Sequence, residues 1–181
     1  MRILSIGIKE LDENKFNPCN DSGTELNKPP FGTCLYGSTM IKNNDGSVGS
    51  DWGRFVQYDY TSKYFNYGIS FTLNKSAKII EIDNLNDYKN LLSEYVINEG
   101  FFNTINFYKL SKDYDAFHLT EKAFWEMRLP ILMNDEEYDF FYNKSNAGFY
   151  SYDAETWILF NLDCINKGSI LNHNNIKYFY Q

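Results

Sequence analysis

The feature of the sequence that most constrains the fold is a series of short apolar stretches separated by polar turns. Residues 2–8 alternate apolar and polar side chains, which is typical of a strand with one buried face. Further stretches with strand preference are residues 33–36, 65–73, 77–82, 116–119, 148–152, 156–160 and 176–180. Helices interrupt these stretches irregularly, so the sequence predicts an α+β fold and not a regular alternation of strands and helices.

Three helices are predicted from apolar stripes and capping residues. The clearest follows Asp83, the expected N-cap, because residues 85–95 carry Leu and Tyr at helical spacing. Ser50 is expected to cap a short helix, since its hydroxyl can accept a hydrogen bond from a free amide of the first turn. A third helix is predicted to start at Thr120 and to end at Pro130.

Residues 1–181 are predicted to form a single domain. A length of 181 residues is close to that of one domain, and we find no repeat or linker that divides the chain. Residues 9–27 and 37–49 are polar and are predicted to be loops, and residues 74–76 a turn between two strands. Aromatic residues make up 18% of the chain, which predicts an aromatic-rich core.

Charge and composition exclude several classes of protein. A net charge of −7 argues against broad binding to phosphate backbones, which needs clustered Lys and Arg. No apolar run reaches the roughly 18 residues of a membrane span, and the N-terminus lacks the pattern of a signal peptide. Three widely spaced cysteines and two distant histidines fit neither a disulfide framework nor a metal site. We therefore expect a cytoplasmic protein without a bound metal.

Nucleophilic catalysis is not favoured by the sequence. The chain lacks GxGxxG, GxxxxGK[ST], HExxH and GxSxG patterns. A Ser-His-Asp or Cys-His site would have to use His118 or His173. His173 is expected in an exposed, Asn-rich turn, and His118 lies in an apolar strand, where a core imidazole with one hydrogen bond is the favoured interpretation.

Glu155 is the most informative candidate residue. It stands at the start of the apolar, aromatic stretch formed by residues 156–160. One interpretation places its side chain on the solvent side of a half-buried strand, because strands alternate their faces. The other holds a carboxylate at the mouth of a cleft, where it can do chemistry.

Three further segments accompany Glu155. They are KPPFGTCLYGST at residues 28–39, SDWGRF at 50–55 and DYDAFHL at 113–119, and Glu155 itself lies in YDAETW. In this order they resemble small ADP-ribosyltransferase-like proteins of bacteria and their phages, in which KPxGxLWxS is followed by SDWxxW, YDAxxLT and WDxES.LW. The resemblance runs from about residue 28 to 161, most of the chain.

The resemblance implies an enzyme that uses NAD as co-substrate and transfers its ADP-ribose to a protein or nucleic-acid acceptor, as a toxin, a defence effector or a counter-defence factor. Breaking the nicotinamide–ribose bond passes through an oxocarbenium-like state, which a carboxylate near the ribose stabilises. Glu155 would be that carboxylate. The implied fold is a split, strongly bent, antiparallel-rich pair of β-sheets flanked by helices, with Glu155 on a strand that lines the cleft.

The same resemblance implies a set of binding residues. Ser70 is expected to orient Glu155 across the sheet, and Gly37 to let the backbone approach the nicotinamide amide. Ser38 or Thr39 is expected to bond ribose or phosphate oxygens. The remaining candidates are Tyr36, Trp52, Phe55, Tyr67 and Phe71 as walls of the nicotinamide pocket, and Lys28 and Arg54 as partners of the diphosphate. Aromatic side chains as core, and cations as solvated surface, stay open as alternatives.

Two departures from the family pattern leave other functions open. Tyr36 stands where many transferases of this fold carry Arg or His, and residues 153–156 read Asp-Ala-Glu-Thr in place of Asp-x-Glu-Ser. The same fold without turnover, acting as an inhibitor or interaction module, is one alternative. An NAD glycohydrolase, with water as acceptor, is another.

Overall fold

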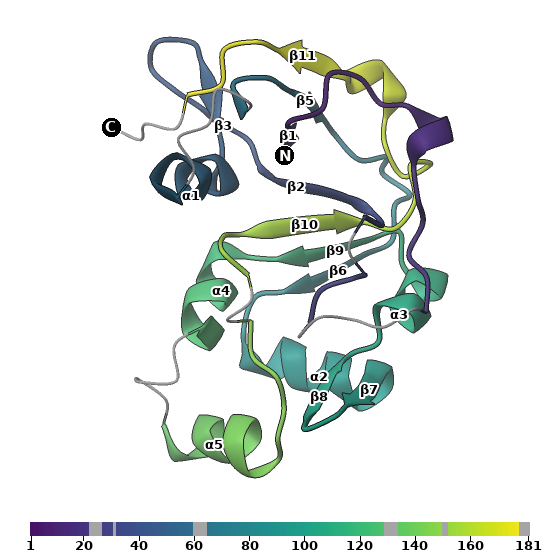
Figure 1. Cartoon of the computed structure of the whole chain (residues 1–181), viewed down its shortest axis with the longest axis vertical. Helices are drawn as coiled ribbons and strands as arrows, with labels where there is room; N and C mark the ends of the chain where they lie inside the picture. Colours follow the sequence, from purple (N-terminus) through teal and green to yellow (C-terminus); the bar gives the residue numbers. More distant parts are fainter. Residues whose placement is uncertain (22–26, 31, 60–64, 129–133, 150–151, 178–181) are drawn as a thin grey trace.

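A large mixed sheet organises the molecule (Figure 1). The computed structural model describes residues 1–21, 27–30, 32–59, 65–128, 134–149 and 152–177. Seven strands form one sheet in the order β11-β5-β1-β2-β10-β9-β6. Their bounds are Ile3–Ile6 (β1), Leu35–Thr39 (β2), Gly68–Phe71 (β5), Ile79–Ile82 (β6), Ala116–Leu119 (β9), Thr156–Leu159 (β10) and Leu171–His173 (β11). Neighbouring strands are antiparallel except β6 and β9, which run parallel.

Strand β2 changes its hydrogen-bonding partner along its length. Its first part pairs with β10, where Gly37 lies opposite Trp157, and its last two residues, Ser38 and Thr39, pair with β1. In Figure 1, β1, β5 and β11 therefore lie above β2, and β10, β9 and β6 lie below it.

Gly37 occupies the position at which this exchange takes place. A Cβ atom on Gly37 would lie 2.5 Å from Ile3 Cγ2 and 3.1 Å from the carbonyl oxygen of Leu4. Because only glycine avoids these overlaps, it lets β1 approach β2 closely.

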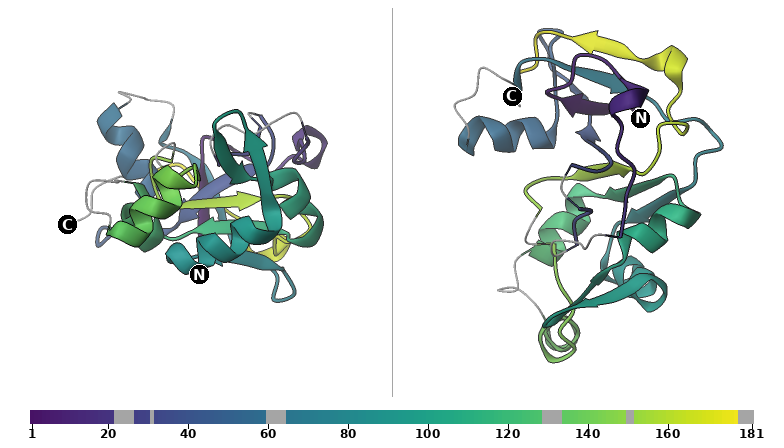
Figure 2. Two further views of the ribbon diagram at one scale, coloured as in Figure 1. Left: turned by 90° about the horizontal axis from the view of Figure 1, so that it is seen from below. Right: turned by 45° about the vertical axis from the view of Figure 1, so that its right-hand side comes forward.

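The α-helices are short: Asp51–Asp59 (α1), Leu85–Tyr95 (α2), Phe107–Asp113 (α3), Glu121–Arg128 (α4) and Asp135–Tyr138 (α5). Three of them, α2, α3 and α4, cover one face of the sheet. Two small hairpins lie outside the large sheet, formed by Ile41–Lys42 (β3) with Val48–Gly49 (β4), and by Val96–Glu99 (β7) with Phe102–Ile105 (β8). Figures 1 and 2 place α1 and β11 at one end of the molecule and α5 at the other. None of the helices in the described part is long and apolar enough to cross a membrane.

Two apolar clusters lie on opposite faces of the sheet. Ile158 belongs to the larger cluster, which α2, α3 and α4 cover, whereas its neighbours Trp157 and Leu159 belong to the other. This division follows from the alternation of side chains along a strand. Phe71 is fully buried in the second cluster, beside Ile3.

Most of the predicted helices and central strands are confirmed. The described fold is α+β, with β1, β9 and β10 inside the stretches predicted as strands. The helix after Ser50 is α1, and the Ser50 hydroxyl accepts a hydrogen bond from the amide of Gly53 at 3.3 Å. The helix after Thr120 is α4, although its predicted end at Pro130 lies outside the described residues.

Several boundaries were predicted wrongly. Residues 37–49 are not a loop, because they complete β2 and form the β3–β4 hairpin. The N-cap of α2 is Asn84, whose side chain accepts from two amides of the first turn, whereas Asp83 accepts from the Thr120 hydroxyl at 2.9 Å. Gly148 and Phe149 lie outside any described strand.

The ends of other strands also differ from the prediction. The stretch 65–73 is a strand only at β5. The turn at 74–76 joins β5 to β6, which lie far apart in the strand order. Of the predicted C-terminal strand, Ile176 forms an isolated bridge with Val48, and residues 178–180 lie outside the described part.

Candidate functional site

The carboxylate of Glu155 is buried and fully hydrogen-bonded where β2 changes partner. Glu155 immediately precedes β10 and is 6% exposed. The hydroxyls of Ser38 and Thr39 donate to it at 2.5 Å and 2.7 Å, and the amide of Thr39 donates at 2.7 Å. A fourth contact joins its Oε1 to His118 Nε2 at 2.7 Å. The interpretation that placed Glu155 on a solvent-facing side of the sheet is therefore wrong.

His118, on β9, links two carboxylates. Its Nε2 faces Glu155, and its Nδ1 lies 2.8 Å from Oε2 of Glu81. Ionised carboxylates only accept hydrogen bonds, so a ring nitrogen that bonds to one has to supply the N–H of that contact. The ring also stacks on Trp157, with centroids 3.9 Å apart and planes at 12°. His118 was expected to be a core imidazole with one hydrogen bond, but its ring makes two, one to each carboxylate.

The environment of Glu155 favours its charged form. Burial raises the pKa of the Glu155 carboxyl, but the hydrogen bonds from His118, Ser38 and Thr39 outweigh it and hold that pKa below its usual range. The opposite holds for Asp51 at the start of α1, whose pKa burial raises even though its Oδ2 accepts the amide of Glu155 at 3.0 Å.

The donors around Glu155 are themselves held in place. Trp157 Nε1 donates to the Thr39 hydroxyl at 3.1 Å, which leaves that hydroxyl's proton for Glu155. The Ser38 oxygen accepts the amide of Trp52 at 3.4 Å while its proton points to Glu155. Each hydroxyl therefore has one orientation that satisfies both of its partners.

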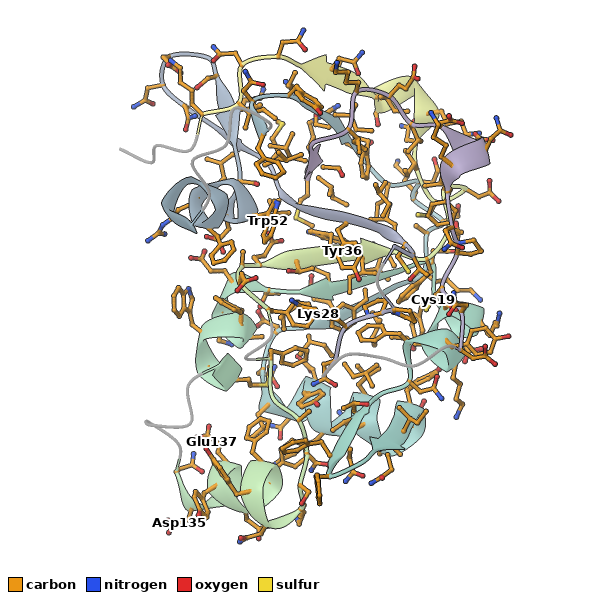
Figure 3. All side chains as sticks on the ribbon, viewed as in Figure 1. Cys19, Lys28, Tyr36, Trp52, Asp135 and Glu137 are labelled. Carbon is orange, nitrogen blue, oxygen red and sulfur yellow. The ribbon has the colours of Figure 1, made fainter. Side chains whose placement is uncertain are left out.

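An aromatic pocket of about 480 Å³ lies beside this network. We call it the aromatic pocket, and its lining residues are Ile6, Lys28, Pro29, Gly32, Thr33, Cys34, Tyr36, Gly37, Trp52, Phe65, Tyr152, Asp153 and Thr156. Figure 3 shows Tyr36, Trp52 and Lys28 gathered around the middle of the molecule, near β10. The Lys28 ammonium lies 5.3 Å from the centre of the Tyr152 ring. Such a site suits a flat ring that carries a few polar groups.

A second, smaller cavity of about 230 Å³ contains the Glu155 carboxylate. We call it the acidic pocket; it is lined by Thr39, Ile41, Asp51, His118, Thr120, Glu121 and Glu155. The two pockets share a wall, because Asp51 and Glu155 face the acidic pocket while their chain neighbours Trp52 and Thr156 face the aromatic one. No group of three or more His, Cys, Asp or Glu side chains suited to a metal ion is found among the described residues.

The structure brings part of the predicted site together. Tyr36, Gly37, Trp52 and Lys28 line the aromatic pocket, as expected for a binding site. Ser38 and Thr39, expected to bond a ligand, instead bond Glu155. The role assigned to Gly37 also changes, because its missing Cβ gives room to Ile3 and Leu4 of the neighbouring strand.

Other predicted residues lie elsewhere. Ser70 does not orient Glu155: its hydroxyl contacts Arg2 Nε at 3.2 Å and His173 Nε2 at 2.7 Å, on a strand that β1 separates from β2. Phe71 is core and not a pocket wall. The Tyr67 ring lies 5.3 Å from the Lys9 ammonium.

Two candidates on α1 remain near the pocket without lining it in the described structure. Phe55 stacks on Trp52 with ring centroids 5.4 Å apart, so it supports one wall of the aromatic pocket. Arg54 is exposed on the same helix.

Sequence reasoning missed His118, Glu81 and Asp51 as parts of the site. The available signal was the position of His118 in an otherwise apolar strand, because a buried polar side chain needs hydrogen-bond partners. Its partners come from β6 and from the residue before β10, which no local pattern identifies. Comparison with known protein families, curated proteins and solved structures gives no match for this chain.

Proposed function

We propose that this protein consumes NAD and transfers its ADP-ribose to a protein or nucleic-acid acceptor, with Glu155 as the catalytic carboxylate. The observation that carries the proposal is the buried, ionised Glu155, oriented by three side chains beside a pocket with aromatic walls. Such a preorganised charge stabilises a developing cation without reorganising water.

In this proposal the nicotinamide occupies the aromatic pocket and its ring stacks on Trp52 or Tyr36. The ribose then lies at the wall shared with the acidic pocket, where Glu155 is within reach. The bond between the ribose C1′ and the nicotinamide nitrogen breaks, and nicotinamide leaves with the electron pair. The Glu155 carboxylate stabilises the resulting oxocarbenium-like charge until a nucleophile of the acceptor attacks C1′.

The sheet register supports the split arrangement that the family resemblance implies. Because β2 pairs with β10 as far as Gly37 and with β1 at Ser38 and Thr39, the change of partner coincides with the residues that hydrogen-bond Glu155. A ligand site at this change of partner is what the proposal requires.

An interaction module without turnover is the second candidate. One observation favours it: four hydrogen bonds already occupy the buried Glu155 carboxylate, as expected for a structural anchor. Tyr36, in place of the Arg or His of many transferases, points the same way.

One experiment separates these functions. The purified protein is incubated with NAD radiolabelled in its adenylate half, with and without a cell lysate. Labelled macromolecules support the transferase, free ADP-ribose without lysate supports the glycohydrolase, and intact NAD in both reactions supports the interaction module. Glu155→Gln is the inactive variant, and Glu94→Gln is the matched control, because Glu94 is exposed on α2 and lines neither pocket.

A further inference from the structure

Three polar side chains from separate segments meet near one edge of the large sheet. Arg2 directly precedes β1, Ser70 lies on β5, and His173 is the last residue of β11. Arg2 Nε and His173 Nε2 lie 3.2 Å and 2.7 Å from the hydroxyl oxygen of Ser70. In Figure 1, β11, β5 and β1 lie side by side above β2. We call these three residues the edge cluster; none of them lines the aromatic or the acidic pocket.

The contacts indicate where the protons of the edge cluster lie. A guanidinium has only donors, so Arg2 donates and the Ser70 oxygen accepts. Other Arg2 donors bond the carbonyl oxygens of Ser70 and Ser169, which fixes the guanidinium in place. Ser70 is fully buried, so its hydroxyl proton needs an acceptor, and His173 Nε2 lies in position to be that acceptor. The arrangement that satisfies every group in the cluster has a neutral His173 with its proton on Nδ1.

The surroundings of His173 favour the same neutral form. Burial, and then the positive charge of Arg2, hold the pKa of the His173 ring below its usual value of 6.5. The lysines on the segments beside β11 are paired with carboxylates, Lys167 with Glu13 and Lys177 with Asp45. A proton on Nε2 would remove the acceptor of the Ser70 hydroxyl and would add a second cation beside Arg2.

Strand β11 has little else to hold it. It is three residues long and lies at the edge of the seven-stranded sheet, with β5 as its neighbour. Its first residue, Leu171, is 53% exposed. The chain after β11 is better anchored, because Ile176 is buried and packs against Leu4 and Val48. The edge cluster therefore holds the strand at a place where apolar burial contributes little.

We propose that His173 is an acid-sensitive switch, which fastens β11 to β5 while it is neutral and releases β11 when it is protonated. Protonation leaves the buried Ser70 hydroxyl without its acceptor, and an unpaired buried polar group costs free energy. It also brings two like charges together. β11 gives way because it is the edge strand, whereas β5 stays paired with β1 on its other side. The switch is independent of the function proposed for the two pockets.

The direction of the pH response follows from the charge of the ring. Because the folded-state pKa of His173 is lowered, its contribution to stability is complete above about pH 6.5 and is lost as the pH falls through the folded-state pKa. Histidine is the side chain whose ordinary titration falls in this range. The response is therefore expected at mildly acidic pH, above the range in which carboxylates ordinarily titrate.

Hydrogen exchange of the full chain, measured by NMR and corrected for the intrinsic effect of pH, tests the switch. Between about pH 7.5 and about pH 5, we expect the amides of β11 to lose protection about tenfold or more. The amides of β9 and β10 should keep theirs, because the edge cluster does not touch these strands. Ring nitrogen shifts at the higher pH should show an unprotonated Nε2 on His173.

His173→Gln is the decisive variant, because its side-chain oxygen can accept the Ser70 proton but does not titrate. It should keep β11 protected at both pH values. Asn172→Ala is the matched control: its side chain is exposed and on the other face of the same strand, so the wild-type response should remain. A pH response that persists in His173→Gln would overturn the proposal. A β11 that stays protected at the lower pH in the wild type, or a proton on Nε2 at the higher pH, would do the same.

Discussion

Glu155 and His118 lie 2.7 Å apart from Oε1 to Nε2, and both side chains are buried. A buried carboxylate is costly unless hydrogen-bond partners surround it, and here the His118 ring, two hydroxyls and a backbone amide do so. The same donors that stabilise the charge also fix the direction in which it points. Stability and proposed chemistry therefore depend on the same hydrogen bonds, and the predictions below are designed to separate them.

Glu155→Gln tests both roles at once. The amide keeps the shape of the side chain but presents an NH₂ group to donors, so we expect the free energy of unfolding to fall by about 1–3 kcal/mol. If Glu155 is the catalytic carboxylate, NAD cleavage by the folded variant should fall on the order of a hundredfold or more. Urea unfolding gives the first quantity, and nicotinamide release at saturating NAD gives the second. Wild-type cleavage in this variant would exclude Glu155 as the stabilising charge.

The pH dependence of stability should report the ionisation of Glu155. Its folded-state pKa lies below 4.5, the usual value for a glutamate, so the folded state binds fewer protons than the unfolded chain in that range. Its stabilising contribution is complete above about pH 4.5 and is lost as the pH falls through the folded-state pKa. We expect the stability difference between the wild type and Glu155→Gln to shrink as the pH falls below about 4.5. A difference that is constant over this range would contradict an ionised Glu155.

NAD should stabilise the protein through the aromatic pocket. A ligand at a hundredfold excess over Kd adds about 2.7 kcal/mol to the free energy of unfolding, which corresponds to roughly 5–10 °C in Tm. Trp52→Ala removes a wall of the pocket and should abolish most of this shift. Trp125→Ala is the matched control, because Trp125 is 50% exposed on α4 and should keep the full shift. Differential scanning fluorimetry with and without NAD, confirmed by calorimetry, measures both; an equal shift in the two variants would place NAD elsewhere.

A side chain at Gly37 should lower the free energy of unfolding, because it meets β1 before it can affect a ligand. Gly37→Ala puts a methyl group 2.5 Å from Ile3 Cγ2, so β1 or Ile3 has to move. Such overpacking costs about 1–3 kcal/mol in the free energy of unfolding. Gly168→Ala is the control, because its nearest contact, Asn166 Oδ1 at 3.5 Å, is an ordinary van der Waals distance. Chemical denaturation of both variants decides; equal stabilities would mean that the contact between β1 and β2 relaxes freely.

Local patterns in the sequence predicted the elements whose burial is periodic. The apolar stripe of α2 and the short run of β9 could be recognised, since the buried residues of α2 recur at helical spacing and all four residues of β9 are buried. The β7–β8 hairpin was missed because Asn98, Asn103 and the exposed Phe101 interrupt any alternation. β3 and β4 were also missed, because the Asn and Gly residues around them led to the prediction of a loop at residues 37–49.

The site was only partly predictable, because its contacts are long-range. Glu155 could be singled out from its position beside an apolar stretch, and Ser38 and Thr39 from the Gly-Ser-Thr sequence that contains them. The hydrogen bonds between them could not be predicted, because Ser38 and Glu155 are 117 positions apart in the sequence. Ser70 was the wrong choice for the same reason: the strand order, which no local pattern gives, places β1 between its strand and β2.

The separation of 117 residues between Ser38 and Glu155 also bears on how the protein is made. During synthesis, β1, β2 and β5 leave the ribosome early and can pair with one another, because all three lie in the first 71 residues. The carboxylate and β10 emerge later, 117 positions behind Ser38. A nascent chain that ends between them would expose the β10-facing edge of β2 without the acid, and would be inactive in the proposed reaction. Long-range closure of this kind tends to be slow, so the site is expected to order after β1, β2 and β5 have paired.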